Sequence, residues 1–325
     1  MRIFITRVIP DAGLQVLQEA GYQISQYTEK RNLPQEELIQ TCQEHDALLS
    51  AGPNQLNAHF FGECSHLKAI SLLSAGYDNV DVAAATRHGM AIGHTPEVLS
   101  GATADVAFLL MLAVSRNAFY MHNSIAKGEW GFYEPTANLG FELTGKTLGV
   151  LGLGRIGMEL ARKCAAAFHM KVIYHNRGRN EQAEKELAAR PVSFEELLQQ
   201  SDVLSVHTIL SRETKGLFDL AAFRKMKPSA IFINTARGSI HQEQDLTEAL
   251  QQGIIWGAGL DVTSPEPMAK DHPLLGMTNV CVLPHIGSAT LETRSAMARR
   301  AAQNIIAGLQ GRPMPHAINP EVYSS

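Results

Sequence analysis

The stretch VLGLGRIG (150–157) constrains the fold more than any other feature of this 325-residue chain. It follows an apolar, strand-like run, opens a helical pattern and carries three glycines in G-x-G-x-x-G spacing: Gly152, Gly154 and Gly157. These glycines allow a tight turn, close approach of the backbone to a pyrophosphate, and close packing of helix on strand. The amides that open the helix, with Arg155 and Ile156, would face the phosphates. The pattern predicts a dinucleotide site.

The next strand-like run ends without the acidic residue that commonly binds the adenosine ribose of NAD. Residues 172–179 read VIYHNRGR and supply Asn176, Arg177 and Arg179 instead. A guanidinium can bind a 2′-phosphate through two hydrogen bonds, whereas a carboxylate repels it. We therefore predict NADPH as the cofactor, with NADH used more weakly. The alternative is a solvated basic loop, which we consider less favoured because we expect no nearby acid to compete for the arginines.

Short apolar runs alternate with helical patterns, which is typical of parallel sheets with helices on their faces. The strands of a first series are expected at 2–7, 22–27, 47–51, 68–74 and 90–95. After one long helical pattern at 97–127, a second series is expected at 147–152, 171–176, 203–208, 230–236, 256–262 and 280–285. A last helix is expected at 293–311, and the coil RPMPHAINP after it is expected to return to the first series.

Composition excludes several classes of protein. The net charge of −4, without a run of Lys or Arg, gives no reason to expect a nucleic-acid partner. The longest apolar run, 106–114, is far shorter than the roughly 20 residues of a membrane span. Four separated cysteines without a C-x-x-C pair indicate a reducing compartment, and we expect the cytoplasm. None of the 13 histidines pairs with another at metal-ligand spacing, so we predict no metal.

Three polar residues stand at the ends of strand-like runs in the second series: Arg237, Glu266 and His285. We expect them to meet, because the ligand crevice of an open α/β sheet lies beyond the carboxyl ends of its strands. A guanidinium binds a carboxylate and polarises the adjacent carbonyl. An imidazole can protonate the carbonyl oxygen as hydride reaches the carbon, and a carboxylate on its other nitrogen fixes the ring. These residue types describe reduction of a 2-oxo acid to a 2-hydroxy acid.

Four segments, GLGRIG, NTARGSIHQEQDLTEAL, GAGLDVTSPEP and LPHIGSAT, together resemble the D-isomer-specific 2-hydroxyacid dehydrogenases. Within that family the chain is most similar to glyoxylate/hydroxypyruvate reductases. The resemblance implies that Arg237, Glu266 and His285 are the catalytic residues. It also implies an α/β fold of two doubly wound parallel-sheet domains. A Rossmann cofactor domain (99–290) would be inserted in a flavodoxin-like substrate domain (1–98 and 291–325), and two chains would form a homodimer through the 97–127 helix.

The resemblance also assigns residues around the nicotinamide and the substrate. The nicotinamide pocket would involve Ile209, Thr235, Asp261 and Gly287, with Asp261 holding the carboxamide. The substrate would contact Ala75, Gly76, Arg237, His285 and Ser288. Taken alone, LLSAGYDNVD (72–81) would instead be a strand-to-helix turn capped by Asp78 or Asn79. Trp130 and Tyr133 could close the pocket, from this chain or a partner, or could only pack within their loop. Ile209 and Arg212 stand where many family members have proline.

The predicted activity is NADPH-linked reduction of glyoxylate to glycolate and of hydroxypyruvate to D-glycerate. His285 would be the general acid, Glu266 would orient it, and Arg237 would bind the substrate carboxylate and carbonyl. One alternative is a dehydrogenase for a larger 2-oxo acid. Another, of a different class, is a dinucleotide-sensing protein like the co-repressors that share this fold and triad. The chain ends soon after the last helix, which favours the enzyme over the co-repressor.

Overall fold

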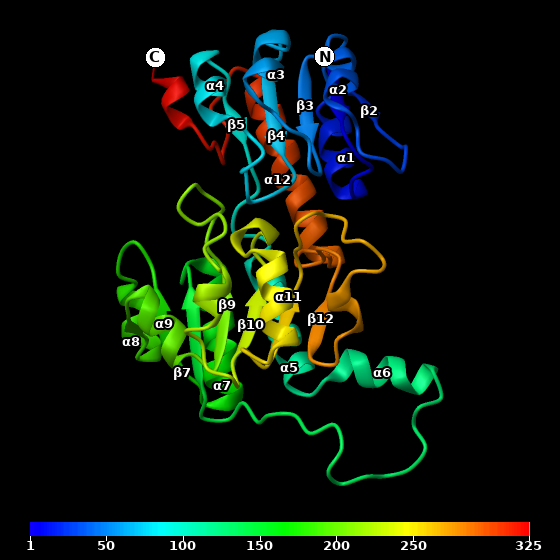
Figure 1. Cartoon of the computed structure of the whole chain (residues 1–325). Coiled ribbons are helices and arrows are strands. Elements are labelled where there is room, and N and C mark those ends of the chain that lie inside the picture. The colour runs from blue at the N-terminus through cyan, green and yellow to red at the C-terminus, as the bar shows by residue number, and fades with distance from the viewer. Residues whose placement is uncertain (325) are drawn as a thin grey trace. The chain divides into compact units, whose positions relative to one another are not determined.

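The computed structural model describes residues 1–324, and it divides into two compact units. The first unit combines Met1–Leu99 with Ser288–Ser325, and the second is Ser100–Gly287. Each unit is built on one parallel sheet (Figure 1). The expected domain boundaries, after residues 98 and 290, lie within a few residues of these divisions.

The first unit has a five-stranded parallel sheet in the order β2-β1-β3-β4-β5, which is the flavodoxin-like order. Its strands are β1 (Arg2–Ile5), β2 (Gln23–Gln26), β3 (Ala47–Ser50), β4 (Ala69–Leu72) and β5 (Ile92–Gly93). Its helices are α1 (Asp11–Glu19), α2 (Gln35–Cys42), α3 (Ala58–Glu63), α4 (Val82–Arg87) and α12 (Leu291–Leu309). All five predicted strands are present. Every residue of β3 and β4 is buried, which explains why these runs are continuously apolar or small rather than alternating.

The end of the chain completes this first unit. Helix α12 packs against α1 so closely that a Cβ added at Gly13 would lie 2.8 Å from the Cβ of Ala298. Beyond α12, the amide of Ile318 donates to the carbonyl of Ile92 at 2.7 Å, and the Asn319 side chain accepts from the Ile92 amide at 2.9 Å. The prediction that the last coil returns to the first series is therefore confirmed. A short 3-10 helix, η3 (Pro320–Tyr323), follows.

The second unit has a seven-stranded parallel sheet in the order β12-β11-β10-β9-β6-β7-β8. The six predicted strands are present as β6 (Thr147–Leu151), β7 (Lys171–His175), β9 (Val203–Val206), β10 (Ile231–Asn234), β11 (Gly257–Leu260) and β12 (Val280–Val282). The helices on this sheet include α7 (Arg155–Phe168), α8 (Glu181–Leu187), α9 (Phe194–Gln200), α10 (Leu220–Phe223) and α11 (Glu243–Gln251). Two 3-10 helices are η1 (Gly238–Ile240) and η2 (Pro273–Gly276). The order reverses between β6 and β9, where doubly wound sheets bind ligands.

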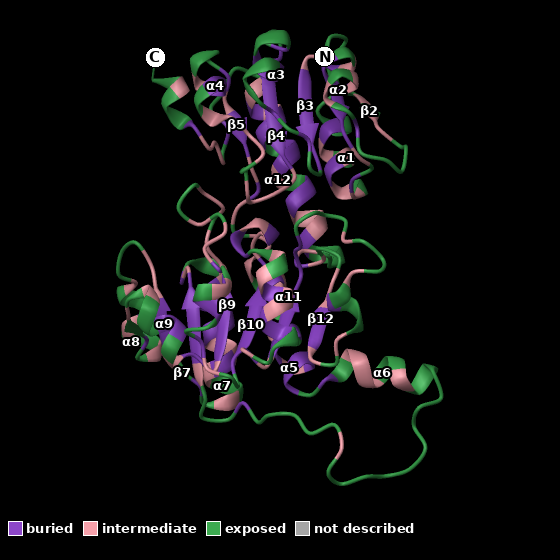
Figure 2. Ribbon diagram, viewed as in Figure 1, coloured by how far each residue is buried: buried purple, intermediate pink, exposed green. Residues whose placement is uncertain are grey.

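The expectation of one long helix at 97–127 is wrong. Two helices, α5 (Ser100–Ser115) and α6 (Ala118–Ala126), meet at an angle of 66°. Between them Asn117 adopts a left-handed backbone with φ 53°, which ends the first helix. Helix α5 buries eight of its residues, whereas α6 buries none (Figure 2). No single described helix is long and apolar enough to cross a membrane, although this bent pair passes on length and composition.

Candidate active site

The turn between β6 and α7 leaves room and donors for an anion. Gly152 has φ +89°, and a Cβ there would lie 2.6 Å from the amide nitrogen of Thr208. A Cβ on Gly157 would lie 2.8 Å from the carbonyl oxygen of Gly152, so the helix packs directly on the turn. A Cβ on Gly154, in contrast, would meet no atom within 4 Å. No side-chain cap hydrogen bond is made at Gly154, the residue before α7, so the start of this helix is not closed by a capping side chain.

The three predicted catalytic residues follow three neighbouring strands, β10, β11 and β12. Nδ1 of His285 lies 3.0 Å from Oε2 of Glu266, and the side chains are 51% and 39% exposed. The other carboxylate oxygen of Glu266 accepts a hydrogen bond from the amide of Thr263 at 3.0 Å. Both oxygens of Glu266 are therefore engaged, which fixes the carboxylate against the imidazole and leaves Nε2 of His285 for a substrate.

The net effect of its surroundings is to lower the pKa of Glu266. Partial burial raises this pKa, but the hydrogen bonds from His285 and Thr263 and the charges of His285 and Arg237 outweigh burial. Glu266 is therefore ionised at neutral pH. An ionised carboxylate can accept a hydrogen bond from Nδ1 and so hold the orientation of the imidazole.

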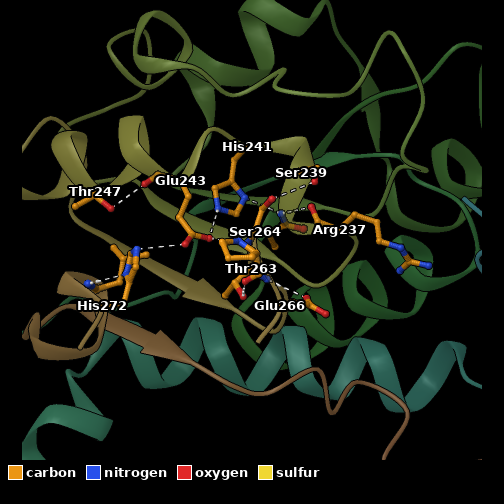
Figure 3. A network of polar contacts seen from close by, with 12 residues as sticks. Arg237, Ser239, His241, Glu243, Thr247, Thr263, Ser264, Glu266 and His272 are labelled. Atoms are coloured by element: carbon orange, nitrogen blue, oxygen red, sulfur yellow. Dashed lines mark hydrogen bonds and ion pairs between the residues drawn. The ribbon is translucent and has the colours of Figure 1, made fainter. Parts of the chain in front are cut away.

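Arg237 lies in the turn that follows β10. The side-chain amide of Asn234, at the end of β10, donates to the carbonyl oxygen of Arg237 at 2.9 Å. Nη1 of Arg237 donates to the carbonyl oxygen of Ala236 at 2.8 Å. Figure 3 shows the guanidinium of Arg237 extending away from the loop that carries Glu266.

Asp261 has a structural role that the sequence did not reveal. Its two carboxylate oxygens accept hydrogen bonds from the amides of Ile286 at 2.8 Å and Gly287 at 2.7 Å. Burial raises the pKa of Asp261, and these two amides partly offset that effect. Asp261 therefore fixes the backbone that follows His285, a residue with the left-handed φ of 54°. Its predicted contact with a carboxamide remains a prediction.

Thr235, at the end of β10, supports a cofactor in the crevice. Its hydroxyl oxygen is buried and has no hydrogen-bond partner among residues 1–324. Since buried polar groups are nearly always paired, this hydroxyl fits a ligand group such as the nicotinamide end of a dinucleotide. Ile209, predicted for the same pocket, is 59% exposed on the loop after β9. Together with the open turn at Gly154, these residues fit the predicted group.

The three residues predicted to hold the 2′-phosphate differ in their contacts. Oδ1 of Asn176 accepts from the amide of Leu153 at 2.6 Å, so this side chain braces the glycine turn. Arg179 pairs with Glu184, whose Oε1 also accepts from the hydroxyl of Tyr174 at 2.6 Å. Arg177 makes no hydrogen bond or ion pair with another residue in the described part of the chain.

The expectation that no acid competes for the arginines is therefore wrong for Arg179, because Glu184 binds it. All three predicted residues nevertheless line one pocket of about 210 Å³ at the end of β7. A second acid, Glu213, lies within electrostatic range of Arg177: the hydrogen bond from Ser211 lowers the pKa of Glu213, and the charges of Arg212 and Arg177 add to this effect. The pocket lining thus holds two guanidinium groups and no carboxylate, and Arg177 is the one that forms no ion pair within the described residues.

The predicted substrate loop belongs to the first unit. The hydroxyl of Ser74 donates to the carbonyl of Gly76 at 2.7 Å, and Nδ1 of His94 lies 3.0 Å from the carbonyl of Ala75. The amides of Ala75 and Gly76 donate to no other described residue. These contacts engage the two carbonyls and leave the two amides available to an anion.

The alternative, that Asp78 or Asn79 caps the next helix, is wrong. The cap of α4 is Asp81, whose Oδ1 accepts from the amide of Ala84 at 2.8 Å. Ser288, also predicted to contact substrate, accepts from Arg294 through its carbonyl at 3.2 Å. Trp130 and Tyr133 are 76% and 83% exposed, so neither packs within its own loop.

Both the second unit and the whole chain are similar to known proteins. The model of the D-isomer specific 2-hydroxyacid dehydrogenase NAD binding domain matches residues 108–287. A glyoxylate reductase of Pyrococcus furiosus is 40% identical over 325 residues, 99% of this chain and 96% of that protein. A Thermus thermophilus structure has 39% identity and a TM-score of 0.91, with 98% and 100% of the two chains covered. An NADPH-dependent glyoxylate/hydroxypyruvate reductase of Sinorhizobium meliloti, solved with NADP and malonate, has 27% identity and a TM-score of 0.85, with 98% and 97% covered.

Proposed function

Because the chain belongs to the D-isomer specific 2-hydroxyacid dehydrogenase family, and is a nicotinamide-dependent reductase of a 2-oxo acid, we propose that it reduces glyoxylate and hydroxypyruvate with NADPH. The observation that carries the proposal is the 3.0 Å contact between His285 and Glu266, beside the turn of Arg237. Relatives named glyoxylate reductase support the smaller substrate. The Sinorhizobium meliloti enzyme, named for both substrates, supports the second.

In this mechanism each of the three residues has one task. The guanidinium of Arg237 binds the substrate carboxylate and polarises the adjacent carbonyl. Nε2 of His285 donates a proton to the carbonyl oxygen of the substrate as the carbonyl carbon accepts hydride. Glu266 holds Nδ1, so that the ring keeps its orientation. A bound reduced nicotinamide supplies the hydride. The carbonyl thereby becomes an alcohol and the carboxylate is unchanged.

We propose NADPH over NADH because Arg177 faces the pocket at the end of β7 and no acidic side chain lines that pocket. Its guanidinium would bind the 2′-phosphate, and Asn176 would hold the glycine turn in shape from the same strand end. Arg179 would contribute its charge while paired with Glu184. We further propose that the enzyme works in the cytoplasm, where its four free thiols would stay reduced.

We also propose a homodimer. After α6 the chain runs out in an extended loop (Figure 1) with three exposed aromatic side chains: Trp130, Phe132 and Tyr133. The loop is anchored where it returns, because Phe141 packs edge-on against Trp256 with ring centroids 4.5 Å apart. Exposed apolar clusters of this kind mark contacts with other chains. A second copy of this chain would cover them.

Initial rates with glyoxylate and hydroxypyruvate, each against NADPH and NADH, test the function. We expect turnover with both acids and a preference for NADPH. His285→Gln should lower kcat by about 10²- to 10⁴-fold while leaving cofactor binding intact, because only the proton donor is lost. Turnover only with branched or aromatic 2-oxo acids would replace the proposed substrates. Cofactor binding without turnover of any 2-oxo acid would instead support the dinucleotide sensor.

A further inference from the structure

Behind the catalytic turn, one carboxylate links the segments that carry Arg237 and Glu266. Glu243 opens helix α11, directly after that turn, and its side chain is only 8% exposed. Its Oε2 accepts a hydrogen bond from the amide of Ser264 at 2.8 Å, and its Oε1 lies 3.2 Å from Nε2 of His272 (Figure 3). A single side chain thus joins three segments of the second unit.

Both groups that face this carboxylate are hydrogen-bond donors. Nδ1 of His272 accepts from the amide of Leu274 at 3.3 Å, which leaves Nε2, 3.2 Å from Oε1 of Glu243, as the ring nitrogen that can present a proton to the carboxylate. The amide of Ser264 can only donate. Among side chains of this length, only a carboxylate offers an acceptor oxygen at each of the two positions of its terminal group. A glutamine at this position would place an NH₂ group against one of the two donors.

The contact at Ser264 leads directly to the catalytic pair. Ser264 follows Thr263, whose amide holds Oε1 of Glu266 at 3.0 Å. A Cβ added at Gly238 would lie 2.0 Å from the carbonyl oxygen of Thr263, so the turn after Arg237 touches this loop backbone to backbone. A shift of Ser264 would therefore displace the donor that orients Glu266 and the surface on which the Arg237 turn rests.

A second chain of contacts runs from Glu243 to Arg237. The fully buried His241 lies between them, and its Nε2 is 4.0 Å from Oε2 of Glu243. Its Nδ1 accepts from the amide of Asn234 at 3.1 Å, and the same amide donates to the carbonyl of Arg237 at 2.9 Å. Burial lowers the pKa of His241 to about 4, so the ring is neutral at neutral pH, and its buried Nε2 has no hydrogen-bond partner among the described residues.

We propose that Glu243 is a positioning residue for the reduction. It contacts neither substrate nor cofactor. It holds the amide of Ser264, and through that loop it keeps the carboxylate of Glu266 aligned with His285. This inference rests on the proposed function, because it assigns Glu243 a part in the same reaction.

The test compares the full-length wild type with Glu243→Gln and with Glu248→Gln. Glu248 lies on the same helix, and within the described part of the chain its side chain bonds only Gln252, at 3.0 Å, so it controls for the loss of one charge. We expect Glu243→Gln to lower kcat for glyoxylate by about 10- to 100-fold, with a smaller change in KM, because sub-ångström misplacement of catalytic groups is costly. Glu248→Gln should match the wild type.

The pH profile separates positioning from general destabilisation. In Glu243→Gln the carboxylate of Glu266 loses contacts that lower its pKa, so the acid limb of kcat/KM should move to higher pH. NADPH affinity, measured by fluorescence titration, should stay within about 2-fold of the wild type. A crystal structure of the variant should show the contact between Glu266 and His285 longer than 3.0 Å. An unchanged kcat, acid limb and contact distance would overturn the inference.

A double variant, Glu243→Gln/His272→Ala, covers the case in which the single variant does not fold. Without the imidazole of His272, the carbonyl oxygen of the glutamine can accept from the amide of Ser264, and its NH₂ group no longer faces another donor. Both kcat and the acid limb should therefore return toward the wild type. A double variant as impaired as the single one would overturn the inference. Absence of wild-type turnover with every 2-oxo acid would contradict the proposed function itself, so the two failures are distinguishable.

Discussion

Two carboxylates near His285 have different surroundings, and their pKa values shift in opposite directions. Glu266 is half exposed and accepts hydrogen bonds from His285 and Thr263, which lowers its pKa despite partial burial. Asp261 is buried, and burial raises its pKa although two amides bind it. The first carboxylate is therefore suited to orient a proton donor, and the second to hold backbone.

The lowered pKa of Glu266 predicts how activity depends on pH. In the proposed mechanism the ionised carboxylate orients His285, so the contribution of Glu266 to activity is present above this pKa and is lost as the pH falls through it. We expect the acid limb of kcat/KM to lie below the ordinary glutamate value of about 4.3. Glu266→Gln should remove this limb and lower kcat, as measured by initial rates from pH 3.5 to 7, about the range that brackets that value. An acid limb that persists in Glu266→Gln would assign it to another group.

Arg177 and Arg179 should differ in what their removal does. Arg177→Ala should weaken NADPH binding by about 10- to 100-fold, because one charge-assisted contact is worth roughly 1.5–3 kcal/mol. NADH binding should be unchanged. Arg179→Ala should weaken NADPH less and lower the stability of the unit, since it strips Glu184 of its partner beside the buried Tyr174. Arg190→Ala, on the adjacent edge strand, is the control. Equal use of both cofactors by the wild type would instead indicate that this loop is a solvated basic surface that does not bind the 2′-phosphate.

At the scale of helices and strands, buried apolar strands were predictable from the sequence, whereas an exposed edge strand and the interruption of a helix were not. The strands of both sheets were found because most of them are buried on both faces. Strand β8 (Arg190–Pro191) was missed, since it has two exposed residues and no apolar run. The break at Asn117 was also missed, because the apolar spacing continues through it and only its backbone conformation marks it.

Each predicted catalytic residue follows a strand, and a strand of this kind can be located in the sequence by its apolar run. The contacts that hold them are harder to predict. Glu243 and Ser264 are separated by a helix and a strand, and Asp261 binds amides beyond β12. Sequence spacing cannot show that such groups meet, because their distance depends on how β10, β11 and β12 align.

Two glycines on helices of the first unit should respond oppositely to alanine. Gly13→Ala would place a Cβ 2.9 Å from the carbonyl of Ala298, so α1 and α12 must separate, at about 1–3 kcal/mol. Gly62→Ala in α3 meets no atom within 4 Å and should stabilise by roughly 0.5–1 kcal/mol through helix propensity. Urea unfolding followed by circular dichroism measures both. Equal effects would show that α1 and α12 are not in tight contact in solution.

At the scale of the whole molecule, the aromatic loop predicts the oligomeric state. Replacing Trp130, Phe132 and Tyr133 together by Ser should convert a dimer to a monomer, because the apolar area that would join the two copies is lost. Light scattering coupled to gel filtration gives the mass directly. Val8→Ser, which removes another exposed apolar side chain, should leave the mass unchanged. A monomeric wild type would contradict the proposed homodimer.

The ribosome releases the strands of the first unit long before the helix that covers them. Ile3 and Ile5 pack with Ala298 and Ile305 in one core cluster, so this core stays open until α12 has been synthesised. At 5–20 residues per second, the interval from residue 99 to residue 309 lasts roughly 10–40 s. The second unit is contiguous and can fold within that interval. The nascent first sheet meanwhile keeps an apolar face exposed, and a chain that stalls before α12 would keep it exposed and open to aggregation.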